Sequence, residues 1–175
     1  MGKSGLSYSK LYAPVAHLNR PDAYGSCSMS ENIPLCVFTE GHITLPDRYQ
    51  DRTVNVFTLP GENTPAFNIS RDNLNEDESL PDYIDRQLAL MEKHLKGWKQ
   101  TERVPAVLGD YLLQGECVHA SYLRDGKRIW QQQAVFNIAK KPVLVFTMTC
   151  TAKLTDADSQ QFQALLASFC LTPDS

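Results

Sequence analysis

The sequence feature that most constrains the fold is an Asp-Gly pair between two long β patterns. Residues 111–123 and 128–138 both have the composition and alternation typical of strands. Asp125 and Gly126 lie between them and supply the tight turn preferred by antiparallel neighbours. A second turn, at residues 140–142, leads into a third pattern over residues 143–151. The second half of the chain is therefore predicted to form an antiparallel meander.

The last strand of this meander is apolar on both faces. Successive side chains of a strand point to opposite faces of the sheet. One face is predicted to carry Leu144, Phe146, Met148 and Cys150, and the other Val143, Val145, Thr147, Thr149 and Thr151. A neighbouring helix or strand can cover the second, β-branched face at little cost in free energy.

Shorter β patterns and two helices account for the rest of the chain. Strands are expected over residues 37–45, with a possible bulge at Gly41, over 53–59 and over 66–71. A helix is expected from an N-cap at Ser79 to about residue 96, and a final helix opens at Asp156. These elements predict an α+β fold, a largely antiparallel sheet with the helices packed on one face.

The segment 53–59 carries apolar residues on both faces, which a surface strand does not need. Phe57 and Leu59 are predicted to point into the core, and Val54 and Val56 to point away from it. Because Val is favoured in strands wherever it sits, the two valines alone do not distinguish a binding surface from an ordinary strand.

Two glutamines are further candidates for a binding surface. Gln87 borders the apolar stripe of the first helix, and Gln133 projects from the middle of a strand where β-branched residues are usual. An amide both donates and accepts hydrogen bonds, so it can satisfy polar atoms of a bound chain. Side chains that simply face water remain the alternative for both glutamines.

The order of three segments resembles the DcrB-related family. LPDRYQDRTVNVFTLP is followed by AFNISRDNL and then by a helix that opens LPDYIDRQL. Within this family the chain resembles most the Eag chaperones, which accompany type VI secretion effectors and are encoded next to them. The likeness covers about residues 36–171 and rests on patterned residues, without any catalytic motif.

The resemblance implies a PsbP-like fold and a cytoplasmic homodimer that shields the hydrophobic N-terminal helices of an effector carrying a PAAR domain. The implied client-binding residues are Val54, Val56, Asn68, Gln87 and Gln133. Asn68 departs from the expected pattern, because an apolar side chain there would strengthen a surface built on the two valines. No cofactor is implied.

The composition narrows the possible partners and location. A net charge of −3 gives no basic patch for nucleic acid, and no run of about 20 apolar residues is present to span a bilayer. Five widely spaced cysteines indicate reduced thiols and a cytoplasmic protein rather than a disulfide framework. Residues 1–34 are expected to be an N-terminal extension, with Met29 a possible natural start, and residues 35–172 the chaperone domain.

Two other classes of protein stay open. A DcrB-like envelope protein needs a signal peptide with a lipid-accepting cysteine, and Cys27 lacks the preceding apolar run. A small enzyme needs a pocket of coupled titratable groups, and no catalytic or metal-binding motif is recognisable. Cys117 and His119 share one strand face, but without a second pair of ligands they are predicted to be structural.

Overall fold

The computed structural model describes residues 35–38, 40–46, 48–49, 51–61, 63–109 and 112–171. The chain divides into two compact units, Met1–Pro46 and Asp47–Ser175. The predicted extension over residues 1–34 lies outside the described residues, as does Cys27.

The described part of the first unit is a two-stranded hairpin. β1 (Leu35–Phe38) pairs antiparallel with β2 (Gly41–Thr44), and Phe38 lies opposite Gly41. The prediction of one bulged strand over residues 37–45 is wrong, because the chain reverses direction before Gly41 and the two halves pair with each other.

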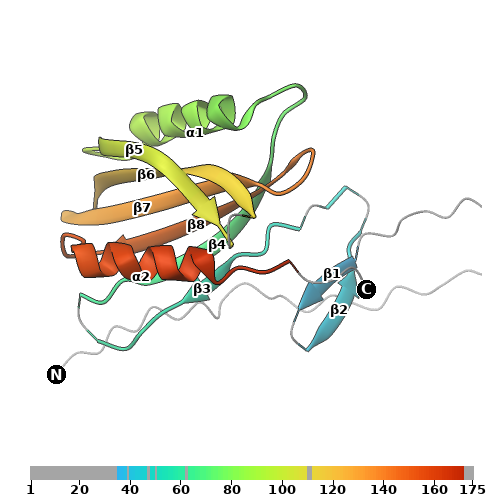
Figure 1. Ribbon diagram of the computed structural model, residues 1–175, viewed down its shortest axis with the longest axis horizontal. Helices are drawn as coiled ribbons and strands as arrows, with labels where there is room; N and C mark the ends of the chain where they lie inside the picture. Colours follow the sequence, from blue (N-terminus) through green and yellow to red (C-terminus); the bar gives the residue numbers. More distant parts are fainter. Residues whose placement is uncertain are drawn as a thin grey trace, which may run out of the picture. The chain divides into compact units, whose positions relative to one another are not determined.

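The second unit is built on a six-stranded antiparallel sheet (Figure 1). In spatial order its strands are β3 (Asn55–Phe57), β4 (Ala66–Asn73), β8 (Pro142–Cys150), β7 (Lys127–Asn137), β6 (Leu113–Arg124) and β5 (Lys99–Leu108). The predicted meander of three strands is confirmed as β6, β7 and β8, and β5, which was not predicted as a strand, extends it beside β6. Arg124 pairs with Lys127 across the turn, where Asp125 and Gly126 have φ angles of 51° and 75°.

Two helices complete the unit, and both begin where the sequence predicts. α1 (Leu80–His94) is capped by Ser79, whose side chain accepts a hydrogen bond from the backbone N–H of Asp82. α2 (Asp156–Ala167) opens with a capping box in which Thr155 and Asp158 each bond the other's backbone. The α+β class and the antiparallel sheet are therefore confirmed.

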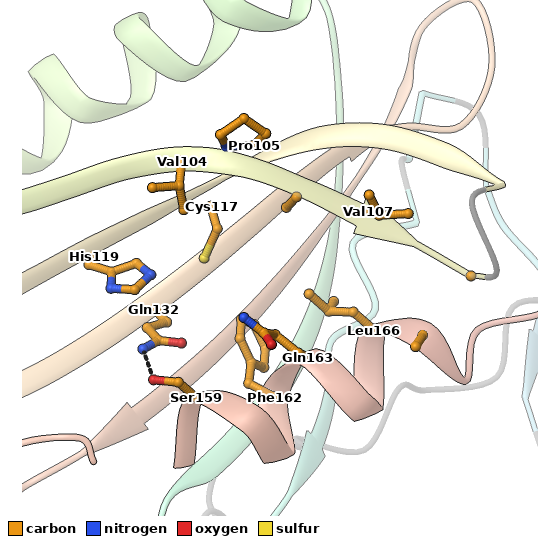
Figure 2. Close-up of a pocket in the computed structure, with 13 residues that line it drawn as sticks. Val104, Pro105, Val107, Cys117, His119, Gln132, Ser159, Phe162, Gln163 and Leu166 are labelled. Atoms are coloured by element: carbon orange, nitrogen blue, oxygen red, sulfur yellow. Dashed lines mark hydrogen bonds between the residues drawn. The ribbon is translucent and has the colours of Figure 1, made fainter. Parts of the chain in front are cut away.

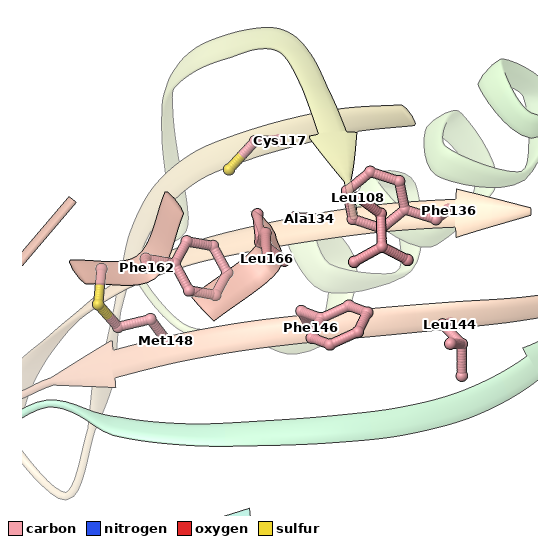
Figure 3. Packing of buried hydrophobic residues seen from close by; sticks show 9 residues of the cluster. All are labelled: Leu108, Cys117, Ala134, Phe136, Leu144, Phe146, Met148, Phe162 and Leu166. Atoms are coloured by element: carbon pink, nitrogen blue, oxygen red, sulfur yellow. The ribbon is translucent and has the colours of Figure 1, made fainter. Parts of the chain in front are cut away.

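The helices lie on opposite faces of the sheet, so the expectation of both on one face is wrong (Figure 1). β8 explains the arrangement, because its two faces are both apolar and each needs a cover. The α1 helix packs Tyr83 and Ile84 against Val143 and Val145. The α2 helix closes the larger core on the other side (Figure 3), which contains Leu108, Cys117, Ala134, Phe136, Leu144, Phe146, Met148, Phe162 and Leu166.

The edge strand β3 corrects a second expectation. Phe57 and Leu59 are 50% and 67% exposed, so the prediction that they point into the core is wrong. Phe57 lies opposite Phe67 of β4, and Phe67 stacks on Phe162 of α2 with ring centroids 6.1 Å apart. The α2 helix therefore covers the sheet as far as β4. Phe57, on the next strand β3, stays half exposed.

Candidate functional site

A row of side chains crosses the sheet on one face and includes three of the predicted binding residues. Residues directly opposite each other on paired strands project to the same side. From the β3 edge inward, the register aligns Val56, Asn68, Thr147, Gln133 and Val118.

This row lies on the face covered by α1. Val118 is buried and belongs to the same apolar cluster as Tyr83 and Ile84 of α1. At the other end of the row Val56 is 64% exposed, at the sheet edge. The row therefore runs from an open apolar edge to a position under the helix.

The fourth predicted residue, Gln87, is brought to the row by α1. Gln87 and Gln133 line one cavity of about 160 Å³ between α1 and the sheet. Leu88 and Met91 of α1 line the same cavity. The sequence analysis did not predict that these two would line a cavity with Gln87, although Met91 follows Gln87 by one helical turn.

Gln133 and Asn68 both neighbour Thr147 in this row. The Gln133 amide nitrogen donates to Thr147 Oγ1 at 3.4 Å, and both side chains are partly or fully buried. Asn68, half-buried, lies on the other side of Thr147, between it and Val56. The centre of the row is therefore polar, and only its β3 end is both apolar and open.

Val54 immediately precedes β3 and is 51% exposed. This end of the edge strand is fixed by Arg71 of β4, whose Nη1 donates to the Thr53 carbonyl oxygen and to Asn55 Oδ1, both at 3.0 Å. Val54 is thus held between two residues that contact β4, although it lies outside the strand itself.

Polar contacts hold α1 against the sheet. The Tyr83 hydroxyl donates to Asp72 Oδ2 of β4 at 3.0 Å, and burial followed by this bond raises the pKa of Tyr83. Arg103 of β5 donates to Asp85 of α1 and to Glu116 of β6, and hydrogen bonding to Glu116 is the main reason that its pKa is raised. Gln87, two residues beyond Asp85, is therefore held over the sheet.

The N-terminal end of α1 has its own ion pair. Arg86 Nε lies 2.6 Å from Glu78 Oε1, and Arg86 Nη2 donates to Glu78 Oε2 at 2.9 Å. The hydrogen bond from Arg86, aided by the Asn75 backbone N–H, lowers the pKa of Glu78 to about 2. The loop before α1 is thereby tied to the helix.

The described residues contain no group of three or more His, Cys, Asp or Glu side chains arranged to hold a metal ion. Cys117 and His119 do share one face, as the sequence predicts, and both line a cavity on the α2 side of the sheet.

Within the described part of the chain, no helix is both long and apolar enough to cross a bilayer.

Known proteins resemble this chain over most of its length. The DcrB family model matches residues 40–168. The protein named Effector EagT6 of Pseudomonas aeruginosa is 34% identical over 122 residues, which cover 64% of this chain and 78% of that protein. The crystal structure of a Pseudomonas aeruginosa protein of unknown function, PA94, described as a putative regulator, has a TM-score of 0.63 and 26% identity, covering 81% of this chain and 98% of that one. The resemblance drawn from the residues is confirmed: the chain belongs to the DcrB family and is close to the Eag proteins within it.

Proposed function

We propose that this chain is a chaperone that binds the hydrophobic N-terminal helices of a type VI secretion effector and shields them before export. The observation that carries the proposal is the row on the α1 face, which joins the exposed Val56 through Asn68 to Gln133 beside Gln87. Similarity to EagT6 supports a role beside a type VI effector, and no catalytic chemistry is part of the proposal.

A membrane-spanning client segment needs a binding partner in water because its apolar surface is large. A membrane-spanning client segment has about 20 apolar residues, and burying its surface is favourable by about 25 cal/mol per Å². Soluble proteins rarely expose apolar patches of that size. Val54 and Val56 offer apolar contact for a client helix, and the amides of Gln87 and Gln133 offer donors and acceptors for its polar atoms.

Co-purification tests the proposal directly. The tagged chain is expressed in the cytoplasm together with the N-terminal region of the effector encoded beside its gene. We expect a stable complex and higher effector levels than without the chaperone. An effector segment that stays soluble and equally abundant alone, and does not co-purify, contradicts the proposal.

We also propose that the chaperone is a cytoplasmic homodimer. β3 is an edge strand, and the half-exposed Phe57 and the exposed Leu59 beside it are apolar surface that a second copy can cover. Light scattering at micromolar concentration should give about twice the chain mass of 19.7 kDa. A mass equal to one chain contradicts the dimer, and recovery of the native protein as a lipidated envelope species favours the DcrB-like alternative.

A further inference from the structure

A second cavity lies on the α2 side of the sheet, opposite the proposed client site. It has a volume of about 610 Å³ and is bounded by β5, β6, β7 and α2 (Figure 2). Its apolar walls include Val104, Ala106, Phe162 and Leu166. Small-molecule sites commonly have volumes of about 300–1,000 Å³ and apolar walls.

One end of this cavity is polar. The Gln132 amide nitrogen donates to Ser159 Oγ at 2.7 Å, and Ser159 Oγ donates to the Thr155 carbonyl oxygen at 3.2 Å. Gln132 is only 6% exposed, and Figure 2 shows its carbonyl oxygen turned away from Ser159 into the cavity. Among the described residues, none donates a hydrogen bond to that oxygen, so the acceptor is accessible to a donor group inside the cavity.

The electrostatic character of the cavity selects against ions. Its lining contains no Lys, Arg, Asp or Glu. His119 also lines the cavity, and its Nδ1 lies 3.4 Å from Glu102 Oε2, outside the lining. Burial raises the pKa of the Cys117 thiol to about 12, which leaves it neutral at physiological pH. An anionic ligand would therefore be desolvated without a Lys or Arg side chain in the lining to pair with it.

The dimensions also separate this cavity from the proposed client. A helix of 20 residues is about 30 Å long and 10 Å wide and occupies roughly 2,400 Å³. That is several times the volume of the cavity, so a membrane-spanning helix does not fit within it.

We infer that this cavity binds an uncharged small amphiphile. Its apolar body packs between Val104, Phe162 and Leu166, and its hydroxyl or N–H group donates to Gln132 Oε1. The site lies on the other face from Val56 and does not depend on the chaperone proposal.

Fluorescence of N-phenyl-1-naphthylamine tests this inference with the full chain. The probe is uncharged, has two aromatic groups and one N–H donor, and becomes brighter in apolar surroundings. We expect saturable binding at one probe per chain. 1-Decanol should displace it, and decanoate, with the same chain length and a negative charge, should be at least tenfold weaker.

Two variants locate the site. Ala106→Phe fills the cavity and should abolish probe binding, while far-UV circular dichroism confirms that the variant is folded. Gln132→Leu keeps the apolar volume but removes the acceptor, and should weaken 1-decanol about tenfold. The matched control is Val56→Asp, on the opposite face, which should bind the probe as the wild type does.

Several results would overturn the inference. They are absence of saturable binding, unchanged binding by a folded Ala106→Phe variant, loss of binding by the Val56→Asp control, and equal displacement by decanol and decanoate. If Ala106→Phe does not fold, an unchanged 1-decanol affinity in Gln132→Leu contradicts the proposed contact. Client co-purification with Gln132→Leu should be unaffected. A failure of the amphiphile-binding inference can therefore be told apart from a failure of the chaperone proposal.

Discussion

Gln87 of α1 and Gln133 of β7 line the same cavity, although they come from different elements of the fold. Their meeting depends on α1 being held by the Tyr83 hydrogen bond to Asp72 and by the contact between Asp85 and Arg103. The cavity joins the row that begins at Val56, so the amides and the exposed valine belong to one face.

The double change Val54→Asp with Val56→Asp should abolish client co-purification and leave the free protein folded. Both valines are at least half exposed, so the charges stay in water until a client covers them. Each lost valine contact should cost about 1 kcal/mol of binding, and burying an unpaired aspartate should cost more. Co-purification and thermal melting measure the two effects.

Leu112→Asp is the matched control, because Leu112 is also exposed but lies beside β6, away from the β3 edge. It should retain the client. If the double valine variant also retains the client, the binding surface lies elsewhere.

Phe162→Ala should destabilise the protein strongly, and Phe57→Ala only slightly. Phe162 is buried in the α2-side core and stacks on Phe67, so its truncation should lower the free energy of unfolding by about 3–5 kcal/mol. Phe57 is half exposed, and its truncation should cost about 1 kcal/mol or less. Urea unfolding of both variants measures the difference, and equal losses would place Phe57 in the core.

Glu78 should make thermal stability depend on pH in the acid range. Its folded pKa of about 2 lies below the ordinary value of 4.5 because Arg86 donates to the carboxylate. The stabilisation is therefore present above about pH 4.5 and is lost as the pH falls toward 2. The melting temperature of Glu78→Gln should fall less over this window than that of the wild type.

Glu76→Gln, at an exposed position of the same loop, is the control for this measurement. Its pH dependence should match the wild type. The interpretation fails if Glu78→Gln and the wild type lose stability in parallel.

Cys117 should react with iodoacetamide far more slowly than Cys170. Burial raises the pKa of Cys117 to about 12, so little thiolate exists at pH 8, whereas Cys170 is exposed. Peptide mass spectrometry after timed labelling should show at least a tenfold difference, which disappears in urea. Equal rates in the folded protein would contradict the burial of Cys117.

The three-stranded meander and the helix starts could be predicted because their signals are local. The turn at Asp125 and Gly126, the cap at Ser79 and the acidic start of the final helix at Asp156 act within a few residues of chain. The face on which each helix packs is not local. The β-branched face of β8 could be seen in the sequence, but only the fold shows that Tyr83 and Ile84 bury Val143 and Val145.

For the candidate site too, single residues could be predicted from the sequence, whereas their arrangement could not. Val56, Asn68 and Gln133 could each be singled out from strand patterns, but their alignment in one row depends on the register of four strands. The inward direction assigned to Phe57 failed because alternation gives the face of a strand and not whether a helix reaches it. Gln132 was not predicted as a site residue, because its bond to Ser159 joins elements distant in sequence.

The three consecutive glutamines of β7 also bear on how the sheet avoids misfolding. If the pairing of β7 shifted by one residue, an amide would still lie on each face of the sheet near Gln132. The middle of the strand therefore specifies its register only weakly. The same slip would send Phe136 toward α1 and Val135 toward α2, exchanging side chains of different size between the two cores. Correct pairing of β7 is therefore enforced from its ends, by the Asp125-Gly126 turn and by the Val135-Phe136 step.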